Sequence, residues 1–148
     1  MSGPADPLDL ERQVCFTLSI AARAVVAAYR PLLDPLGLTH PQYLVMVALW
    51  QHGPSTVGDL SARLALDSGT LSPLLHRLEG HGLVRRERAA HDQRRVVVVV
   101  TDEGMRLRGQ AEQVHAGVVR RLGLDADQLA LLQGALVQVI ASTTSTAD

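Results

Sequence analysis

The chain has 148 residues, of which 47% are hydrophobic and 3% aromatic, with 14 basic and 15 acidic side chains and a net charge of −1. This length suits one domain, or a small domain with extensions that mediate dimerisation. A single cysteine excludes an intramolecular disulfide and a multi-cysteine zinc site. The six histidines are scattered without paired ligand spacing, so we expect no metal and no cofactor.

The sequence also gives an expectation about membranes. The N-terminus has no basic segment followed by an apolar core, and no apolar run approaches the roughly 20 residues that cross a bilayer. We therefore expect a cytoplasmic protein with no membrane partner.

A long helix is predicted near the N-terminus, within residues 9–36. Asp9 opens it in this interpretation, because an acidic side chain is favourable at the positive end of a helix. Apolar residues then recur at three- and four-residue steps, and Pro31 and Pro35 disturb the end of the helix. We expect the preceding segment, Met1–Pro7, to be frayed.

A second helix is predicted to begin at Thr39, with Pro41 in its first turn, where proline is tolerated. The run Tyr43–Trp50 is apolar on nearly all sides of this helix. A helix of that kind is buried, so we expect it at the centre of the fold.

Residues 54–104 have the pattern of a winged helix-turn-helix, in which two short helices precede two strands. Thr56 and Asp59 fit a capping box at the first helix. Either Asp67 or Ser68 can cap the second helix. Four leucines share one face of that second helix and belong to the predicted core: Leu71, Leu74, Leu75 and Leu78.

The predicted wing follows directly. Leu83–Arg88 reads as a strand and His91–Arg95 as a polar tip. Val96–Val100 is either a second strand or a buried segment, and Thr101 caps the next helix.

The outer face of the second helix is small and polar, which suits entry into the major groove of DNA. It equally suits the solvated side of an ordinary core helix, and the helix alone does not separate the two interpretations. Charge favours DNA, because residues 76–95 carry six arginines and three acids in a chain that is slightly acidic overall. The candidate DNA-binding residues are Ser68, Thr70, Ser72, His76, Arg77, Arg86, Arg94 and Arg95.

Two more helices are predicted, from Asp102 to about Arg121 and from Asp125 to about Ala141, and Gly123 breaks the chain between them. The polar tail from Ser142 is expected to be disordered.

The expected fold class is therefore mainly α with a small β wing. Residues 1–148 form a single chain, in which the winged unit 54–104 is flanked by N- and C-terminal dimerisation helices, 9–36 and 105–141. Their apolar faces exceed what one small winged domain would bury, and a two-fold dimer suits a two-fold operator. The alternative is that these helices complete a monomeric core.

Several motifs resemble a known family. Asp92-x-Arg94, the valine strand that follows, and Thr101-x-x-Gly104 are similar to the wing signature of the multiple-antibiotic-resistance regulator (MarR) family. Other segments are similar to its organic hydroperoxide resistance (OhrR) branch: Val14–Phe16, Tyr29–Leu33, Leu38–Leu44 and Leu66–Leu75.

The resemblance implies a homodimeric repressor that binds double-stranded operator DNA next to a peroxide-detoxifying gene. It implies that organic hydroperoxides oxidise an N-terminal cysteine and so release the repressor from DNA. It also implies that Arg94 enters the minor groove and that Asp92 stabilises the wing.

Cys15 is the candidate redox-active residue. We expect it one or two turns into the first helix, where the positive helix end favours the thiolate, the form that attacks a peroxide bond. The residues alone leave open that Cys15 is merely a small buried hydrophobe. The resemblance implies that tyrosines of the partner subunit hydrogen-bond the thiol. Tyr29 matches one of them, whereas Ser19 stands where the family has the other.

Because there is no second cysteine, a sulfenic acid at Cys15 has no resolving partner within the chain. We expect a low-molecular-weight thiol to cap it as a mixed disulfide, or overoxidation to sulfinic acid. One rival hypothesis is a regulator of the same family that is gated by a small phenolic ligand, with Cys15 incidental. Another is a one-cysteine peroxidase. Arg12 and Thr17 lie outside any peroxiredoxin-like spacing, so we expect no enzyme and no catalytic residues.

Overall fold

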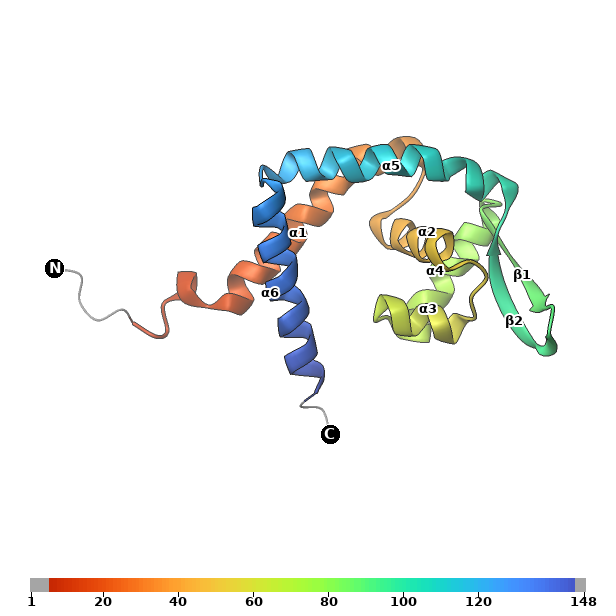
Figure 1. Cartoon of the computed structure of the whole chain (residues 1–148), viewed down its shortest axis with the longest axis horizontal. Coiled ribbons are helices and arrows are strands. Elements are labelled where there is room, and N and C mark those ends of the chain that lie inside the picture. The colour runs from red at the N-terminus through yellow and green to blue at the C-terminus, as the bar shows by residue number, and fades with distance from the viewer. Residues whose placement is uncertain (1–5, 146–148) are drawn as a thin grey trace.

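In the computed structural model, which describes residues 6–145, the chain is elongated and mainly helical, with one small sheet (Figure 1). A lobe containing α2, α3, α4 and both strands lies at one end, and the long helices α1, α5 and α6 extend away from it. This confirms the predicted class, mainly α with a small β wing. The elements in chain order are η1 (Leu10–Arg12), α1 (Val14–Leu33), η2 (Asp34–Leu36), α2 (His40–His52), α3 (Val57–Leu64), α4 (Ser68–Gly80), β1 (Val84–Ala89), β2 (Asp92–Val100), α5 (Asp102–Leu122) and α6 (Ala126–Thr144).

The first long helix begins later than predicted. Asp9 caps only the short 3-10 turn η1, where its carboxylate accepts a hydrogen bond from the Glu11 N–H (3.2 Å). Gln13 is then extended (φ −77°, ψ 112°), which ends that turn, so α1 starts at Val14. Within the segment that was expected to be frayed, residues 1–5 lie outside the described part.

The segment Val14–Leu36 is long and apolar enough to cross a membrane, with a mean hydropathy of 1.3. The expectation that no apolar run approaches this length was therefore wrong. Length and composition are weak evidence of a membrane span, because an apolar helix that packs against protein satisfies the same criteria. Only 6% of its most apolar window is buried within the chain, so α1 leaves an apolar surface uncovered.

Helix α2 is central, as its sequence predicted. Thr39 and Gln42 form a capping box, in which the Gln42 N–H donates to Thr39 Oγ1 and the Thr39 N–H donates to Gln42 Oε1. Val45, Met46 and Leu49 are at most 1% exposed. Leucines from α1, α3 and α4 complete this core, among them Leu33, Leu60, Leu71, Leu75 and Leu78.

Helices α3 and α4 and the two strands form a winged helix-turn-helix. The predicted capping box begins α3, because the Asp59 N–H donates to Thr56 Oγ1 (3.0 Å) and the Thr56 N–H donates to Asp59 Oδ2 (3.1 Å). The tight turn after α3 places Ala65 in the left-handed region (φ 51°). Asp67, rather than Ser68, then caps α4.

The strands β1 and β2 are antiparallel, with Val84 opposite Val100 and Arg88 opposite Val96. The register then shifts, so that Ala89 lies opposite Asp92. The second strand thus begins at Asp92, not at Val96 as predicted. The shift leaves Gln93–Arg95 without register partners in β1, although Arg88 Nη1 of β1 donates to the Gln93 carbonyl (2.6 Å), and these residues bulge from the far end of the wing.

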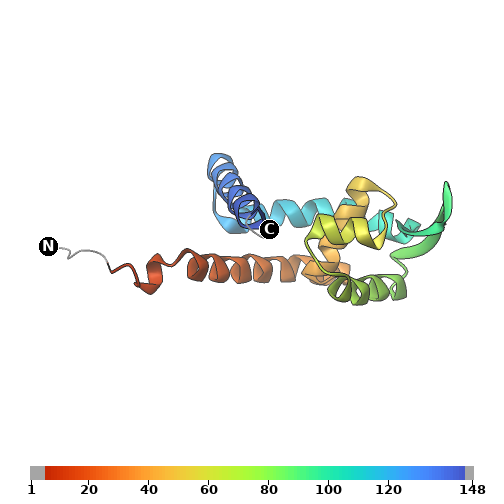
Figure 2. The same ribbon diagram turned by 90° about the horizontal axis from the view of Figure 1, so that it is seen from below.

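Helices α5 and α6 meet at Gly123, whose left-handed backbone (φ 66°) turns the chain. Figure 2 shows α6 clear of the α2–α4 lobe and separate from α1. Helix α6 continues to Thr144, where the hydroxyl donates to the Ile140 carbonyl one turn back (2.8 Å). The expectation of disorder from Ser142 is therefore wrong up to Thr144, and residues 146–148 lie outside the described part.

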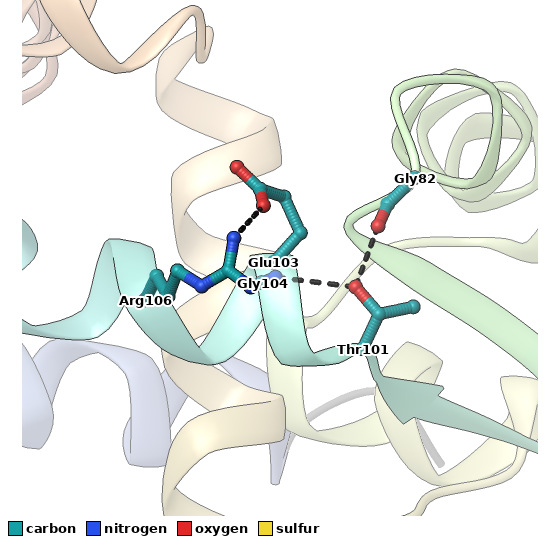
Figure 3. A network of polar contacts seen from close by, with 5 residues as sticks. All are labelled: Gly82, Thr101, Glu103, Gly104 and Arg106. Atoms are coloured by element: carbon teal, nitrogen blue, oxygen red, sulfur yellow. Dashed lines mark hydrogen bonds and ion pairs between the residues drawn. The ribbon is translucent and has the colours of Figure 1, made fainter.

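The start of α5 fits tightly against the turn that follows α4 (Figure 3). The Thr101 hydroxyl donates to the Gly82 carbonyl (2.5 Å) and accepts from the Gly104 N–H (3.1 Å). From the other side, Trp50 Nε1 donates to the Gly104 carbonyl (3.1 Å). A Cβ at residue 104 would lie 2.3 Å from the Leu83 carbonyl oxygen, so the packing requires glycine.

We expect Gly104→Ala to lower the free energy of unfolding by about 1–3 kcal/mol, because backbone atoms cannot yield to the added methyl group. Gly109→Ala is the matched control in the same helix, where a Cβ meets nothing within 4 Å. It should leave stability unchanged or raise it by up to about 1 kcal/mol, since alanine favours helix. Urea denaturation of both variants measures the difference, and equal effects would contradict the packing argument.

Candidate nucleic-acid interface and cysteine site

The exposed face of α4 carries the small polar residues that the sequence singled out. Its four leucines point into the core, and its other side is open to solvent. The exposed candidates on this helix are Ser68, Thr70, Ser72, His76 and Arg77. Such a surface can meet the edges of bases and the phosphates of a groove with hydroxyl and guanidinium groups.

Asp67 fixes the beginning of α4. Its carboxylate accepts a hydrogen bond from the Thr70 N–H (2.7 Å). The hydrogen bonds from Thr70 hold the pKa of Asp67 below its ordinary value of 3.8, because they stabilise the charged form. The polar N-terminal end of α4 therefore has a fixed position.

The arginines of the wing differ in their contacts and positions. Arg86 Nε lies 3.3 Å from Glu79 Oε2 and so ties β1 to α4. Arg94 and Arg95 stand in the bulged segment, both exposed. Asp92 Oδ1 accepts a hydrogen bond from the Arg94 N–H (2.9 Å), which holds the backbone of the bulge. Arg94 is thus projected from a fixed backbone at the far end of the wing.

The sequence did not predict the contact that holds the base of the wing. Ser55 forms a β-bridge to Val98, with N–H to carbonyl distances of 3.1 and 2.8 Å. Ser55 is buried, and its hydroxyl accepts from Arg63 Nη1 (3.0 Å). A serine just before a capping-box threonine gives no periodic signal, so no pattern in the sequence predicts this third strand position.

Cys15 is the second residue of α1 and is exposed in the single chain. It therefore lies in the first turn, nearer the helix start than the predicted one or two turns. Val14 beside it is 72% exposed, and Leu18 and Ser19 are exposed as well. The start of α1 thus presents a thiol among apolar side chains on a surface that the rest of the described chain leaves open.

Tyr29 lies on the same helix, 14 residues further on, or about 21 Å along the axis. The structure does not bring it to Cys15 within one chain. Its ring packs against His40 (centroids 4.7 Å apart) and Tyr43 (5.6 Å) from α2. Burial raises the pKa of Tyr29, so the phenol stays protonated and can donate a hydrogen bond.

A cavity of about 710 Å³ opens between α1 and the start of α2, next to this ring cluster. Apolar side chains line most of it, and Arg23, Arg30, Asp34 and His40 supply its ionisable groups. Sequence reasoning gave His40 no role. A single histidine gives no periodic signal, so no pattern in the sequence indicated it.

A second cavity of about 540 Å³ lies between α2 and α5. Trp50 and Val47 contribute apolar walls, and Arg108, Glu112 and His115 contribute polar ones. Within residues 6–145 no three His, Cys, Asp or Glu side chains gather as a metal site would require.

Comparison with known proteins identifies the family of this chain. The sequence profile of the MarR family matches residues 38–96. The organic hydroperoxide resistance transcriptional regulator of Bacillus subtilis is 39% identical over 132 residues, which cover 87% of this chain and 90% of that protein. The chain belongs to the MarR family. The motifs that indicated the OhrR branch are thus supported by a relative from that branch.

Solved MarR-type structures share the fold. Reduced AbfR bound to DNA, a protein known from Staphylococcus epidermidis, aligns with a TM-score of 0.72 and 32% identity over 91% of this chain and 94% of that one. CouR from Rhodococcus jostii bound to p-coumaroyl-CoA aligns with a TM-score of 0.79 and 28% identity over 90% and 95%. The curated relatives are named as transcriptional regulators, so the comparisons indicate a DNA-binding regulator and give no enzyme family.

The lowered pKa of Asp67, which caps α4, predicts how the stability of the fold depends on pH. A carboxyl whose pKa is lower in the folded than in the unfolded chain stabilises the fold above the unfolded pKa, and this contribution is lost as pH falls through the folded pKa. We therefore expect Asp67→Ala to be less stable than wild type at pH 7, with the difference shrinking below pH 3.8. Asp67→Asn keeps a cap without the charge and serves as control. Urea denaturation at several pH values measures this, and a pH-independent difference would contradict it.

Proposed function

We propose that this protein is a redox-sensing transcriptional repressor, whose reduced homodimer binds operator DNA and leaves it when organic hydroperoxides oxidise Cys15. The observation that carries the proposal is the position of Cys15, exposed in the first turn of α1, in a chain 39% identical to an organic hydroperoxide regulator. The absence of a second cysteine limits the chemistry to one thiol per chain.

The proposed reaction begins with the thiolate, which the positive end of a helix favours. Its sulfur attacks the peroxide, so an S–O bond forms as the O–O bond breaks, giving sulfenic acid and an alcohol. A low-molecular-weight thiol then caps the sulfenic acid as a mixed disulfide, or a second peroxide overoxidises it. Exposed Val14 and Leu18 favour a peroxide with an apolar body.

Dimerisation is supported by the surfaces that a single chain leaves uncovered. Helix α6 has no buried residue, and Leu131 on it is 75% exposed. The apolar surface of α1 is also uncovered, which accounts for its hydropathy without a membrane and fits a cytoplasmic regulator. If two α1 helices run antiparallel, Cys15 of each chain can meet Tyr29 of the other. The crossing point is then Ala22, midway between them, where a small side chain permits close approach.

The DNA contacts follow from the wing and α4. Helix α4 of each subunit enters a major groove, and Arg94 of each wing reaches the adjacent minor groove. Ser19, where the family has a tyrosine, leaves Tyr29 as the phenol of the proposed thiol site. Arg86 acts chiefly through its contact with Glu79, which orients the wing against α4.

The central test is release from DNA by cumene hydroperoxide. We expect the reduced protein to lose operator binding after treatment, and Cys15→Ser to bind equally well before and after it. A fluorescence-anisotropy titration measures both, and the serine variant's binding before treatment is the folding control. Release of Cys15→Ser by the peroxide would overturn the proposal.

A second test concerns the wing. We expect Arg94→Ala to weaken DNA binding and to reduce the slope of log affinity against log salt concentration by about one for each phosphate charge that Arg94 neutralises. Arg106→Ala is the control, because this exposed arginine pairs with Glu103 on α5, away from the wing tip. Equal slopes of log affinity against log salt concentration for Arg94→Ala and wild type would show that Arg94 does not contact the DNA backbone.

One observation favours a second candidate function, a repressor gated by a small phenolic ligand. The cavity between α2 and α5 combines Trp50 with Arg108 and His115, and the similar protein CouR was solved with p-coumaroyl-CoA. In the same anisotropy assay, release by salicylate together with no release of the wild type by peroxide would favour this candidate.

A further inference from the structure

We propose that His40 is the proton carrier of the cysteine site, accepting the proton of the partner subunit's Cys15 thiol and passing it to the alkoxide that leaves the peroxide. The inference rests on the proposed function, since it requires the antiparallel meeting of two α1 helices. It adds a chemical role to a residue that the resemblance left without one.

The first support is contact. The imidazole of His40 lies 4.7 Å from the Tyr29 ring, centroid to centroid, with the rings inclined at 57°. In the proposed dimer, the partner's Cys15 that meets Tyr29 therefore also comes near the His40 ring. Its backbone is held by the Thr39 capping box and by Pro41, so the imidazole stands on a rigid helix start.

The second support is the cavity. His40 lines the space of about 710 Å³ between α1 and α2, together with Val26 and Ala27, which precede Tyr29 by three and two residues. Its walls are mostly apolar, which suits the organic part of a hydroperoxide. The cavity thus holds the His40 imidazole beside a mostly apolar space, and His40 joins this space to the ring of Tyr29, which does not itself line it.

The third support is the set of ionisable groups around His40. Arg23 and Arg30 from α1 stay charged, and they favour an anion such as a thiolate in the cavity. Asp34 from η2 lines the same space, and burial raises the pKa values of Tyr29 and of Tyr43 on α2. Of these groups, only an imidazole both accepts and releases a proton near neutral pH.

Burial also lowers the pKa of His40 below its ordinary 6.5, so the ring is neutral at pH 7 and one ring nitrogen has a free lone pair. Burial alone makes the imidazole a weaker base, and the negative thiolate beside it stabilises the imidazolium that forms. The thiol proton moves to the imidazole, which leaves a thiolate beside an imidazolium. The thiolate sulfur then bonds to one peroxide oxygen while the O–O bond breaks. Sulfur loses two electrons, the peroxide gains them, and the imidazolium protonates the departing alkoxide to an alcohol.

The experiment compares the second-order rate of Cys15 oxidation by cumene hydroperoxide in full-length wild type, His40→Phe and His40→Gln between pH 5.5 and 9.5. His40→Phe keeps a ring against Tyr29 but carries no proton. His52→Gln is the matched control, an exposed histidine at the other end of α2. Loss of free thiol gives the rate, and operator binding before oxidation shows that each variant is folded.

We expect both His40 variants to react at least tenfold more slowly than wild type at pH 6.5. The gap should shrink as the pH rises, because hydroxide then removes the thiol proton without a carrier. His52→Gln should follow wild type throughout. A rate ratio that does not change with pH, or no difference at all, would overturn the role of His40 while leaving Cys15-dependent release intact. Peroxide release that does not need Cys15 would overturn the proposed function and this inference together.

Discussion

The close approach of α5 to the turn after α4 is the contact on which the rest of the structure depends. At Gly104 the helix backbone lies so near the Leu83 carbonyl that no side chain fits, and Thr101 bridges the same turn through two hydrogen bonds. This contact joins the DNA-reading unit to a helix of 21 residues, about 31 Å long. Because the joint is tight, any tilt of α5 must move α4 and the wing with it.

The other end of α5 meets the cysteine-bearing helix. A Cβ at Gly117 would lie 2.9 Å from Leu32 Cδ1 on α1, so these two helices also pack closely, and a larger residue would require the Leu32 side chain to shift. Arg121 Nη1 adds a contact at 3.5 Å to the Ala28 carbonyl. A continuous path of packed atoms therefore runs from α1 through α5 to the wing. In the proposed mechanism, a bulky cap on Cys15 acts at one end of this path, and the spacing of the two α4 helices responds at the other.

The parts of this fold that are set by local chemistry could be predicted from the sequence. The capping box at Thr56 and the four leucines of α4 act within one turn or one helix face, and both lie where the pattern indicated. The start of α1 was missed because the extended conformation of Gln13, rather than the charge of Asp9, decides where the helix begins. The bulge at Gln93–Arg95 was missed because register depends on pairing between strands, which no single segment encodes.

The same distinction applies to the candidate site. Cys15 was identifiable as a residue type at a helix start, and Tyr29 through its resemblance, but their relation cannot appear within one chain because the helix holds them about 21 Å apart. His40 could not be identified from the sequence for a different reason. A single histidine forms no pattern, and its contact with the Tyr29 ring appears only in the structure.

Ser19, which stands where the family has a tyrosine, makes the contact between the His40 and Tyr29 rings more important for the proposed site. Ser19 follows Cys15 by one helical turn, on the same face of α1, and its short hydroxyl cannot reach as far as a phenol. In the proposed site, the thiolate therefore has one phenolic donor fewer than the family pattern supplies. A phenol with a raised pKa only donates, whereas an imidazole also takes a proton away, so a site with Tyr29 and His40 divides two tasks between two rings. The Tyr29 phenol stabilises the thiolate once it has formed, and the His40 imidazole governs how readily the thiolate forms.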